Sequence, residues 1–312
     1  MEIDITNVHL DLGASLRGTD MGAGAMHVAG LSAKLERLGY SIESIKNLVA
    51  SEEDGDEGRA DARYLQVITD LCRKLADRVE SGCEAGHLPL VLGGDHAQAI
   101  GTISGMARYY KRRGERLGVI WVDAHTDMNT PETSPSGNIH GMPLAVLLGH
   151  GPKELVEIAG DEPALNPEDV AIIGIRDVDP SEIPLVRETG VAAYPMSELD
   201  ARSVPVCVAE AVERVTKHTV GVHLSFDLDG VDPAEAPGVG TPVPGGLTLR
   251  ESHFICEALA RTGKLVGMEM VELNPTLDVR NQTGKLAVWL IESALGRTIL
   301  GKRPSYLKPP RK

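Results

Sequence analysis

Short apolar runs alternate with longer stretches of helical periodicity along almost the whole chain, and this alternation constrains the fold most. Seven runs have the length and composition of strands: 3–10, 88–92, 117–122, 170–175, 191–194, 219–226 and 265–271. Most of them are apolar on both faces, as strands are when helices cover both sides of a sheet. Strands that alternate with helices form βαβ units. The sequence therefore predicts an α/β fold around a parallel β-sheet.

The segments between these runs complete the expected architecture. Helices are predicted over 23–38, 62–81, 97–110, 142–148, 180–189, 206–217, 248–261 and 283–295. The acidic stretch 51–61 and the Gly- and Pro-rich stretches 151–168 and 232–247 are expected to be loops, and the basic tail 302–312 to be mobile or to pack on a neighbouring subunit. No linker divides the chain, so we expect residues 1–312 to form a single domain.

Charge and cysteine content exclude several classes of function. The formal net charge is −14, which argues against nucleic acid and anionic membranes as partners. The four cysteines show no zinc-binding spacing, and we expect them to be free thiols in a reducing compartment. There is no signal peptide pattern, and the apolar stretches are far shorter than the ~20 residues of a membrane span. We expect a cytoplasmic protein.

Polar residues follow five of the predicted strands, at the point where each strand ends. They are Asp95 and His96; Asp123, His125 and Asp127; Asp177 and Asp179; Asp227, Asp229 and Asp232; and Glu272. Ligands of open α/β sheets bind at the carboxyl ends of the strands. If strand geometry continues beyond residue 122, the alternating Asp123, His125 and Asp127 would also share one face.

Gathered in one crevice, these carboxylates would repel one another unless a cation compensated them. A mixture of carboxylates and imidazoles suits a divalent ion such as Mn²⁺, and bridging carboxylates would allow two ions. Any one of these residues alone would more simply be a helix cap or a satisfied core residue. Three such groups together, one of them with the spacing D-x-H-x-D, favour a metal centre.

Five motifs, in order along the chain, resemble those of the ureohydrolase superfamily and, within it, the arginase family. They are "GGDHAQAIG", "VDAHTDMNTPETSPSGNIHGMP", "SFDLDGVDP", "GTPVPGGLTLRE" and "MEMVELNP". The resemblance extends to "DLGASLRGTDMGAGAMHVAG", "GIRDVDP" and "YLKPP", and so covers nearly the whole chain. It implies a three-layer α/β/α fold, two Mn²⁺ ions per subunit (Co²⁺ or Fe²⁺ being alternatives), and a homo-oligomer, either a trimer or a hexamer.

The resemblance also implies two sets of metal ligands. One ion would be held by His96, Asp123, Asp127 and Asp227, and the other by Asp123, His125, Asp227 and Asp229. Asp123 and Asp227 would bridge. Asp95 is a weaker candidate that would orient the His96 ring, and Asp232 is expected to anchor a loop.

The expected reaction is hydrolysis of a guanidinium group by a hydroxide that bridges the two metal ions. Asp127 would carry a proton to the leaving amine. By resemblance, His140 would serve as proton shuttle or general acid with a pKa near neutrality. Glu272 would pair with the guanidinium, and Thr241 would contribute a hydroxyl. The competing interpretations are a hydrogen-bonded loop histidine for His140 and an ordinary turn residue for Thr241.

The same resemblance places recognition of a free amino acid in the loops. Asn129, Ser134, Ser136 and Asn138 would bind the α-carboxylate, directly or through water, and Asp179 with Glu182 would bind the α-ammonium. Arginases commonly carry Thr where this chain has Ser134, a change that keeps the hydroxyl. Ser and Asn are common in any loop, so the residues alone do not assign these roles.

These residues leave four candidate functions to be distinguished. The first is conversion of L-arginine and water to L-ornithine and urea. The second is a related ureohydrolase acting on agmatine or a guanidino acid, which would not need both sets of α-group contacts. The third is a catalytically silent arginine-binding protein, which should have lost a metal ligand. A binuclear phosphoesterase would favour basic residues in the loop 129–141, which has neither Lys nor Arg.

Overall fold

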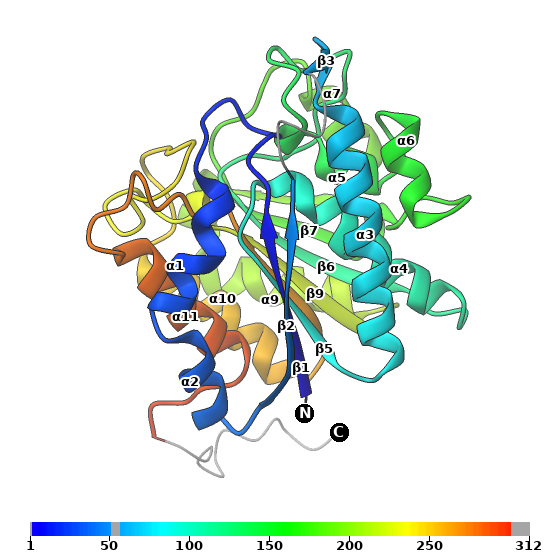
Figure 1. Ribbon diagram of the computed structural model, residues 1–312. Coiled ribbons are helices and arrows are strands. Elements are labelled where there is room, and N and C mark those ends of the chain that lie inside the picture. Colours follow the sequence, from blue (N-terminus) through cyan, green and yellow to red (C-terminus); the bar gives the residue numbers. More distant parts are fainter. Residues whose placement is uncertain (1, 51–56, 301–312) are drawn as a thin grey trace.

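The computed structural model describes residues 2–50 and 57–300. A sheet of eight strands forms the centre of the molecule (Figure 1). The strand order is β2-β1-β5-β10-β9-β6-β7-β8, and every neighbouring pair is parallel, as predicted. The strands are β1 (Glu2–His9), β2 (Ser41–Val49), β5 (Leu88–Leu92), β6 (Leu117–Val122), β7 (Val170–Ile175), β8 (Ala192–Pro195), β9 (Gly221–Asp227) and β10 (Leu265–Val271). All seven predicted strands are present.

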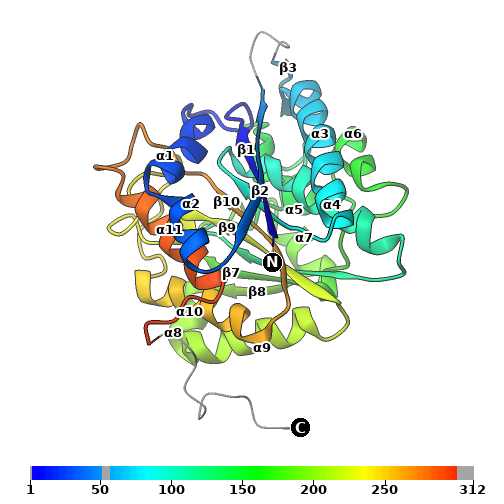
Figure 2. The same cartoon turned by 60° about the horizontal axis from the view of Figure 1, so that its bottom comes forward.

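Helices cover both faces of this sheet, and each face has its own apolar core (Figure 2). One layer contains α1 (Gly22–Val28), α2 (Leu31–Arg37), α8 (Met196–Arg202), α9 (Val204–Thr216), α10 (Leu249–Thr262) and α11 (Gln282–Ala294). The other contains α3 (Leu65–Glu84), α4 (Ala99–Lys111), α5 (Pro143–Leu147), α6 (Lys153–Val156) and α7 (Ile183–Thr189). The three-layer α/β/α architecture is therefore confirmed.

The sequence prediction missed β2, and it joined two helices that are separate. β2 lies at an edge of the sheet, where six of its nine residues are exposed and the apolar run that marks a central strand is absent. The predicted helix 23–38 is broken at Gly30, whose φ of 86° is left-handed, and becomes α1 and α2. The predicted loop 151–168 contains α6, and α8 was also missed.

Two short strands lie where the acidic loop was predicted. β3 (Gly58–Arg59) and β4 (Ala62–Arg63) form an antiparallel pair, which delays the start of the next helix to Leu65. The rest of that loop, 51–56, and the predicted tail 302–312 lie outside the described residues. Within the part of the chain that is described, no helix is both long and apolar enough to cross a membrane. All four cysteines are buried and unpaired, as expected.

The strand order explains why distant motifs meet. β5, β10, β9 and β6 are consecutive neighbours in the middle of the sheet. Because they are parallel, their carboxyl ends lie along one edge. The six predicted metal ligands and Glu272 lie at or just after the ends of these four strands.

Candidate metal centre

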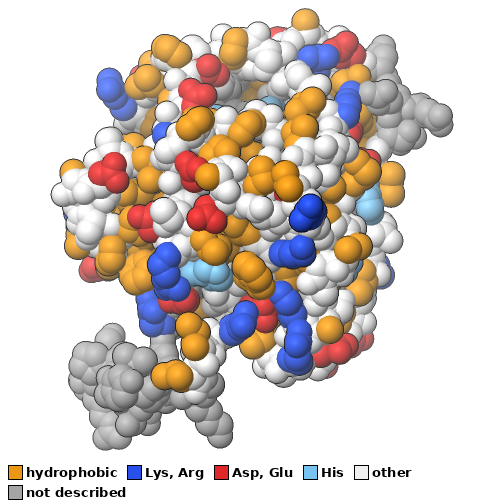
Figure 3. Space-filling view, turned by 90° about the vertical axis from the view of Figure 1, so that its left-hand side faces the viewer, with side chains coloured by type: hydrophobic (Ala, Val, Ile, Leu, Met, Phe, Trp, Pro, Cys, Tyr) orange, Lys and Arg blue, Asp and Glu red, His pale blue; other side chains and the backbone are white. Residues whose placement is uncertain are grey.

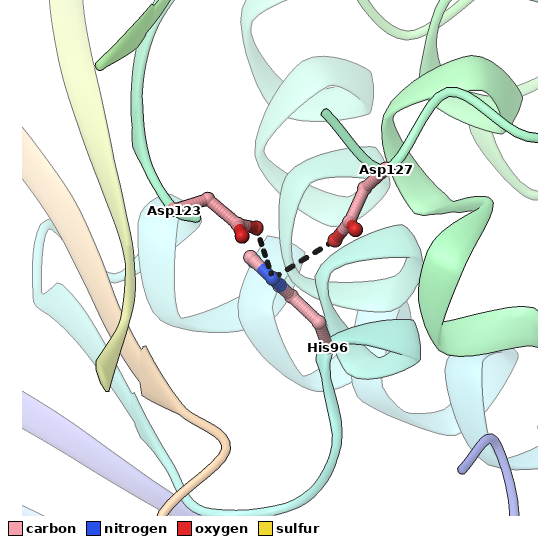
Figure 4. Close-up of side chains that lie close together, drawn as sticks. All are labelled: His96, Asp123 and Asp127. Atoms are coloured by element: carbon pink, nitrogen blue, oxygen red, sulfur yellow. Dashed lines mark ion pairs between the residues drawn. The ribbon is translucent and has the colours of Figure 1, made fainter. Parts of the chain in front are cut away.

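One cluster of carboxylates surrounds the His96 ring (Figure 4). His96 Nδ1 lies 3.2 Å from Asp123 Oδ2, 3.1 Å from Asp127 Oδ2 and 3.1 Å from Asp227 Oδ2. All four side chains are buried. The cluster contains the residues predicted to hold the first ion, and His96, Asp123 and Asp127 already offer ligand atoms within the reach of one cation.

A second cluster shares Asp123 with the first. His125 Nδ1 lies 3.3 Å from Asp123 Oδ1 and 3.1 Å from Asp229 Oδ2. The two oxygens of Asp123 therefore face two different histidines, as a bridging carboxylate requires. Asp227 lies in the first cluster, and its Oδ1 accepts a 2.7 Å hydrogen bond from the Asp229 backbone N–H. The structure thus brings all six predicted ligands together.

The electrostatics of these clusters fit a bound cation. Burial, and then the neighbouring Asp229 and Asp123 carboxylates, raise the pKa of Asp227 well above its ordinary value. Burial and Asp123 likewise raise the pKa of Asp127 to about 7. His96 Nδ1 and Asp127 Oδ2 make no hydrogen bond with any described group, although they are buried. Divalent cations would relieve the repulsion and take up these unused lone pairs.

We expected strand alternation to bring the D-x-H-x-D side chains together, but the segment is not a strand. β6 ends at Val122, and the Asp123 carboxylate folds back to accept a 2.7 Å hydrogen bond from the His125 backbone N–H. Asp127 has a left-handed φ of 51°, a conformation that is unfavourable for a residue other than Gly. Its carbonyl accepts hydrogen bonds from two N–H groups at the start of α5, which hold this turn.

Two further side chains, which were not among the predicted site residues, support His96. The Trp121 ring stacks on the His96 ring with centroids 4.1 Å apart, and its Nε1 donates to Asp123 Oδ2 at 2.9 Å. Ser225 Oγ lies 2.9 Å from His96 Nε2. Trp121 and Ser225 each precede a predicted ligand by two residues on a strand. This period-2 spacing was the signal that could have identified them.

Of the roles expected for Asp95 and Asp232, the structure agrees only with that of Asp232. Asp95 makes no hydrogen bond to the His96 ring, and that expectation was wrong, because Nε2 lies 2.9 Å from Ser225 Oγ and Nδ1 faces other carboxylates. The Asp95 carboxylate instead accepts hydrogen bonds from the Gly13 and Ala97 backbone N–H groups at 2.7 and 3.1 Å. Asp232 accepts from three backbone N–H groups of its own loop, as a loop anchor should.

Glu272 and His140 form a pair beside the first cluster. Glu272 Oε1 accepts a 2.8 Å hydrogen bond from the His96 backbone N–H and lies 3.3 Å from His140 Nδ1. Burial lowers the pKa of His140, but the Glu272 carboxylate outweighs it and raises the pKa to about 9. This pKa is higher than the near-neutral value expected from the sequence. Glu272 also has a left-handed φ of 63°.

A pocket of about 210 Å³ opens above the two clusters. Of the predicted site residues, only Asp123 and Glu272 are absent from its lining. The others line it: His96, His125, Asp127, Asn129, Ser134, Ser136, Asn138, His140, Asp179, Glu182, Asp227, Asp229 and Thr241. Thr241 Oγ1 donates to Asp229 Oδ2 at 2.9 Å. The pocket therefore joins the two candidate metal-binding clusters to the loops expected to recognise an amino acid.

The carboxylates of the recognition loops differ in how they are engaged. Asp179 Oδ2 accepts a 2.9 Å hydrogen bond from Asn129 Nδ2, and the Asp179 side chain lines the pocket. Glu182 is buried, and its oxygens accept from Thr126 Oγ1 and from the Met128 and Asp179 backbone N–H groups. Asp179 is thus better placed to meet a ligand, and Glu182 to hold the loop that presents it.

Distant segments hold the loop 134–141 in place. Asn138 exchanges hydrogen bonds with Ser15, and the His140 backbone N–H donates to the Gly13 carbonyl. The Arg63 N–H of β4 donates to the Gly137 carbonyl. A Cβ on Gly137 would lie 2.0 Å from the Ala60 carbonyl oxygen, so only glycine fits there. The β3–β4 hairpin is therefore part of the support of the pocket.

Comparison with known proteins agrees with this geometry. The family described as "Arginase family" matches residues 1–296. The arginase of Bacillus caldovelox is 47% identical over 96% of this chain and 99% of its own length, and that of Bacillus subtilis is 45% identical with the same coverage. The native structure of the Bacillus caldovelox arginase superimposes with a TM-score of 0.91, covering 95% of this chain and 99% of that one. The chain belongs to the arginase family of hydrolases.

Proposed function

We propose that this protein hydrolyses L-arginine to L-ornithine and urea at a centre of two Mn²⁺ ions. The observation that carries the proposal is the convergence of two His–carboxylate clusters on Asp123, directly beneath a pocket lined by Asp179, Asn129 and serine hydroxyls. An arginase of Entamoeba histolytica, 32% identical and with a TM-score of 0.86 over 95% of this chain and 99% of that one, was solved with L-ornithine.

His96, Asp123, Asp127 and Asp227 would hold one ion, and Asp123, His125, Asp227 and Asp229 the other. When bound, such ions lower the pKa of a water molecule enough to make it a nucleophile at neutral pH. Carboxylate and imidazole donors favour Mn²⁺, with Co²⁺ and Fe²⁺ as alternatives.

The remaining groups would bind the guanidinium and move protons. Asp127 faces the pocket, and its carboxylate would accept the proton that passes to the leaving nitrogen. His140, protonated at neutral pH beside Glu272, would donate a proton as general acid or shuttle. Glu272, whose Oε1 is already engaged, would present Oε2 to the guanidinium, and Thr241 would present its hydroxyl.

The loops would distinguish L-arginine from other guanidino compounds. Neutral donors suit an anion, so Asn129, Ser134, Ser136 and Asn138 would bind the α-carboxylate, directly or through water. Asp179 would bind the α-ammonium, and Glu182 would act through the backbone of Asp179, to which it is hydrogen bonded.

Removing the metal ions should abolish the reaction. After dialysis against a chelator, we expect no urea release from L-arginine, because the carboxylate clusters alone offer no nucleophile. Added Mn²⁺ should restore it, Co²⁺ or Fe²⁺ should restore part of it, and Mg²⁺ should not. Full activity in protein shown by elemental analysis to be metal-free would contradict the proposal.

Asp179→Asn should impair recognition of the α-ammonium. We expect kcat/KM for L-arginine to fall roughly 10- to 100-fold, because a hydrogen bond to a charged group contributes about 1.5–3 kcal/mol. The control is 5-guanidinopentanoate, which lacks the α-ammonium. Its hydrolysis should be slow and unaffected by the substitution. An equal loss for both compounds would show that Asp179 does not bind the ammonium.

We also propose that residues 1–312 act as one domain in a cytoplasmic homo-oligomer, a trimer or a hexamer. The match to bacterial arginases over 96% of the chain supports the single domain. The face over α1, α2 and α11 exposes apolar side chains among charged ones, which supports self-association (Figure 3). Val28 and Trp289 on this face are 83% and 41% exposed.

A further inference from the structure

Four polar side chains lie in the core behind His96, and the proposed chemistry uses none of them. Gln98, His223, Ser225 and Glu269 are each fully buried. His223 and Ser225 are on β9, and Glu269 is on the neighbouring β10, in the middle of the sheet. Burying a carboxylate in a protein core is unfavourable unless hydrogen bonds compensate it. Glu269 must therefore be explained by its contacts.

The contacts of Glu269 lead directly to the metal centre. Ser225 and Glu269 are partners in the register of β9 and β10, and Ser225 Oγ donates to Glu269 Oε1 at 2.9 Å. The same hydroxyl oxygen lies 2.9 Å from His96 Nε2. Glu269 is held by His223 Nε2, 3.2 Å from Oε1, and by Gln98 Nε2, which donates to Oε2 at 3.4 Å.

Counting protons along this chain of contacts gives the tautomer that a neutral His96 ring adopts. A carboxylate only accepts hydrogen bonds, and a hydroxyl has one proton to donate. Because Ser225 gives its proton to Glu269, it can only accept from His96, and Nε2 must carry the hydrogen. The neutral His96 ring is then unprotonated at Nδ1, the atom that faces Asp123, Asp127 and Asp227. Burial raises the pKa of Glu269, but His223 outweighs it and the pKa is lowered, which keeps this carboxylate an acceptor.

We propose that Glu269 is a positioning residue that, acting through Ser225, fixes His96 in the tautomer whose Nδ1 can bind a metal ion. The inference rests on the proposed metal centre. It concerns one of the two ions, because no described residue hydrogen bonds to Nε2 of His125, whose side chain is 26% exposed. His125 should therefore bind its ion independently of Glu269.

Glu269→Gln tests this relay. A glutamine amide can donate to Ser225 Oγ, which frees the hydroxyl proton to turn toward His96 Nε2 and moves the ring proton to Nδ1, against the other ligands. We expect binding of one of two Mn²⁺ ions, measured from the electron paramagnetic resonance signal of free Mn²⁺, to weaken about 10- to 100-fold, as when an outer partner of a metal ligand is lost. The other ion should keep its wild-type affinity.

Glu80→Gln is the matched control. Glu80 is another buried glutamate, but it pairs with Arg108 and Arg112 between α3 and α4, away from the metal centre. The Glu80→Gln variant should bind both Mn²⁺ ions with the affinity of the wild type. If Glu269→Gln also binds both ions with wild-type affinity, the relay is wrong.

Ser225→Ala provides a second test should Glu269→Gln fold poorly. This substitution removes the hydroxyl that connects Glu269 to His96, and it should weaken binding of the same Mn²⁺ ion to a similar extent. The double variant should bind Mn²⁺ no more weakly than Ser225→Ala alone, because Glu269 can act on the ring only through the hydroxyl. Additive losses, or wild-type affinity in Ser225→Ala, would overturn the relay. Wild-type protein that binds no Mn²⁺ would overturn the metal centre itself, and the relay with it.

Discussion

Asp123→Asn should eliminate urea release from L-arginine while the protein remains folded. In the structure, Asp123 Oδ1 faces His125 and Oδ2 faces His96. An asparagine would place its NH₂ group toward one of these histidines in either orientation and would also remove a charge. Losing the shared ligand should exceed the ~10- to 100-fold effect on metal affinity of losing an outer partner. We therefore expect activity to fall by far more than about 100-fold.

The measurement is metal content by elemental analysis together with urea release, at a Mn²⁺ concentration that saturates the wild type. Asp200→Asn, the same change at an exposed position in α8, should retain both ions and full activity. Asp123→Asn that keeps two Mn²⁺ ions and wild-type turnover would show that Asp123 is not a shared ligand.

His140→Asn should lower kcat roughly 10²- to 10⁴-fold, the usual contribution of a general acid or base. The His140 ring lines the pocket and is held by Glu272 in its protonated form, with a pKa of about 9. An asparagine side chain can hydrogen bond but cannot deliver a proton. KM should change little, because His140 has no proposed contact with the α-groups.

Steady-state kinetics with L-arginine separate these two parameters. His150→Asn is the matched control, since His150 is exposed and lies outside the pocket lining. Mn²⁺ content should be unchanged in both variants. A His140→Asn enzyme with unaltered kcat would support the alternative that His140 is an ordinary loop histidine.

Candidate metal-binding residues could be predicted because the chemistry of the residues and the fold agree, whereas the two ligand sets followed from the resemblance to the arginase family. Carboxylates and histidines after buried strands are costly without a cation, and parallel strands bring their carboxyl ends to one edge. The predicted β5, β6, β7 and β10 have the observed bounds. The six proposed ligands therefore lie close together as expected, although they come from three separate motifs.

Features set by tertiary contact could not be predicted in the same way. The edge strand β2 has no apolar run, and only its pairing with β1 defines it. The left-handed turn at Asp127 depends on hydrogen bonds from α5, and the pKa of His140 depends on a glutamate 132 residues away in sequence. Glu269 did leave a signal, since a charged residue interrupts the apolar run of a central strand, but its partner became visible only in the register of β9 with β10.

The most direct test of the proposed activity compares urea release from L-arginine and agmatine by the Mn²⁺-loaded protein. Agmatine has the guanidinium but lacks the α-carboxylate for which Asn129, Ser134, Ser136 and Asn138 are proposed. We expect kcat/KM for L-arginine to be higher by more than about 100-fold, within the ~10⁴-fold that a site built around a substrate's polar group can reach. Faster hydrolysis of agmatine would contradict the arginine assignment, and no urea from either compound would contradict the proposed catalysis.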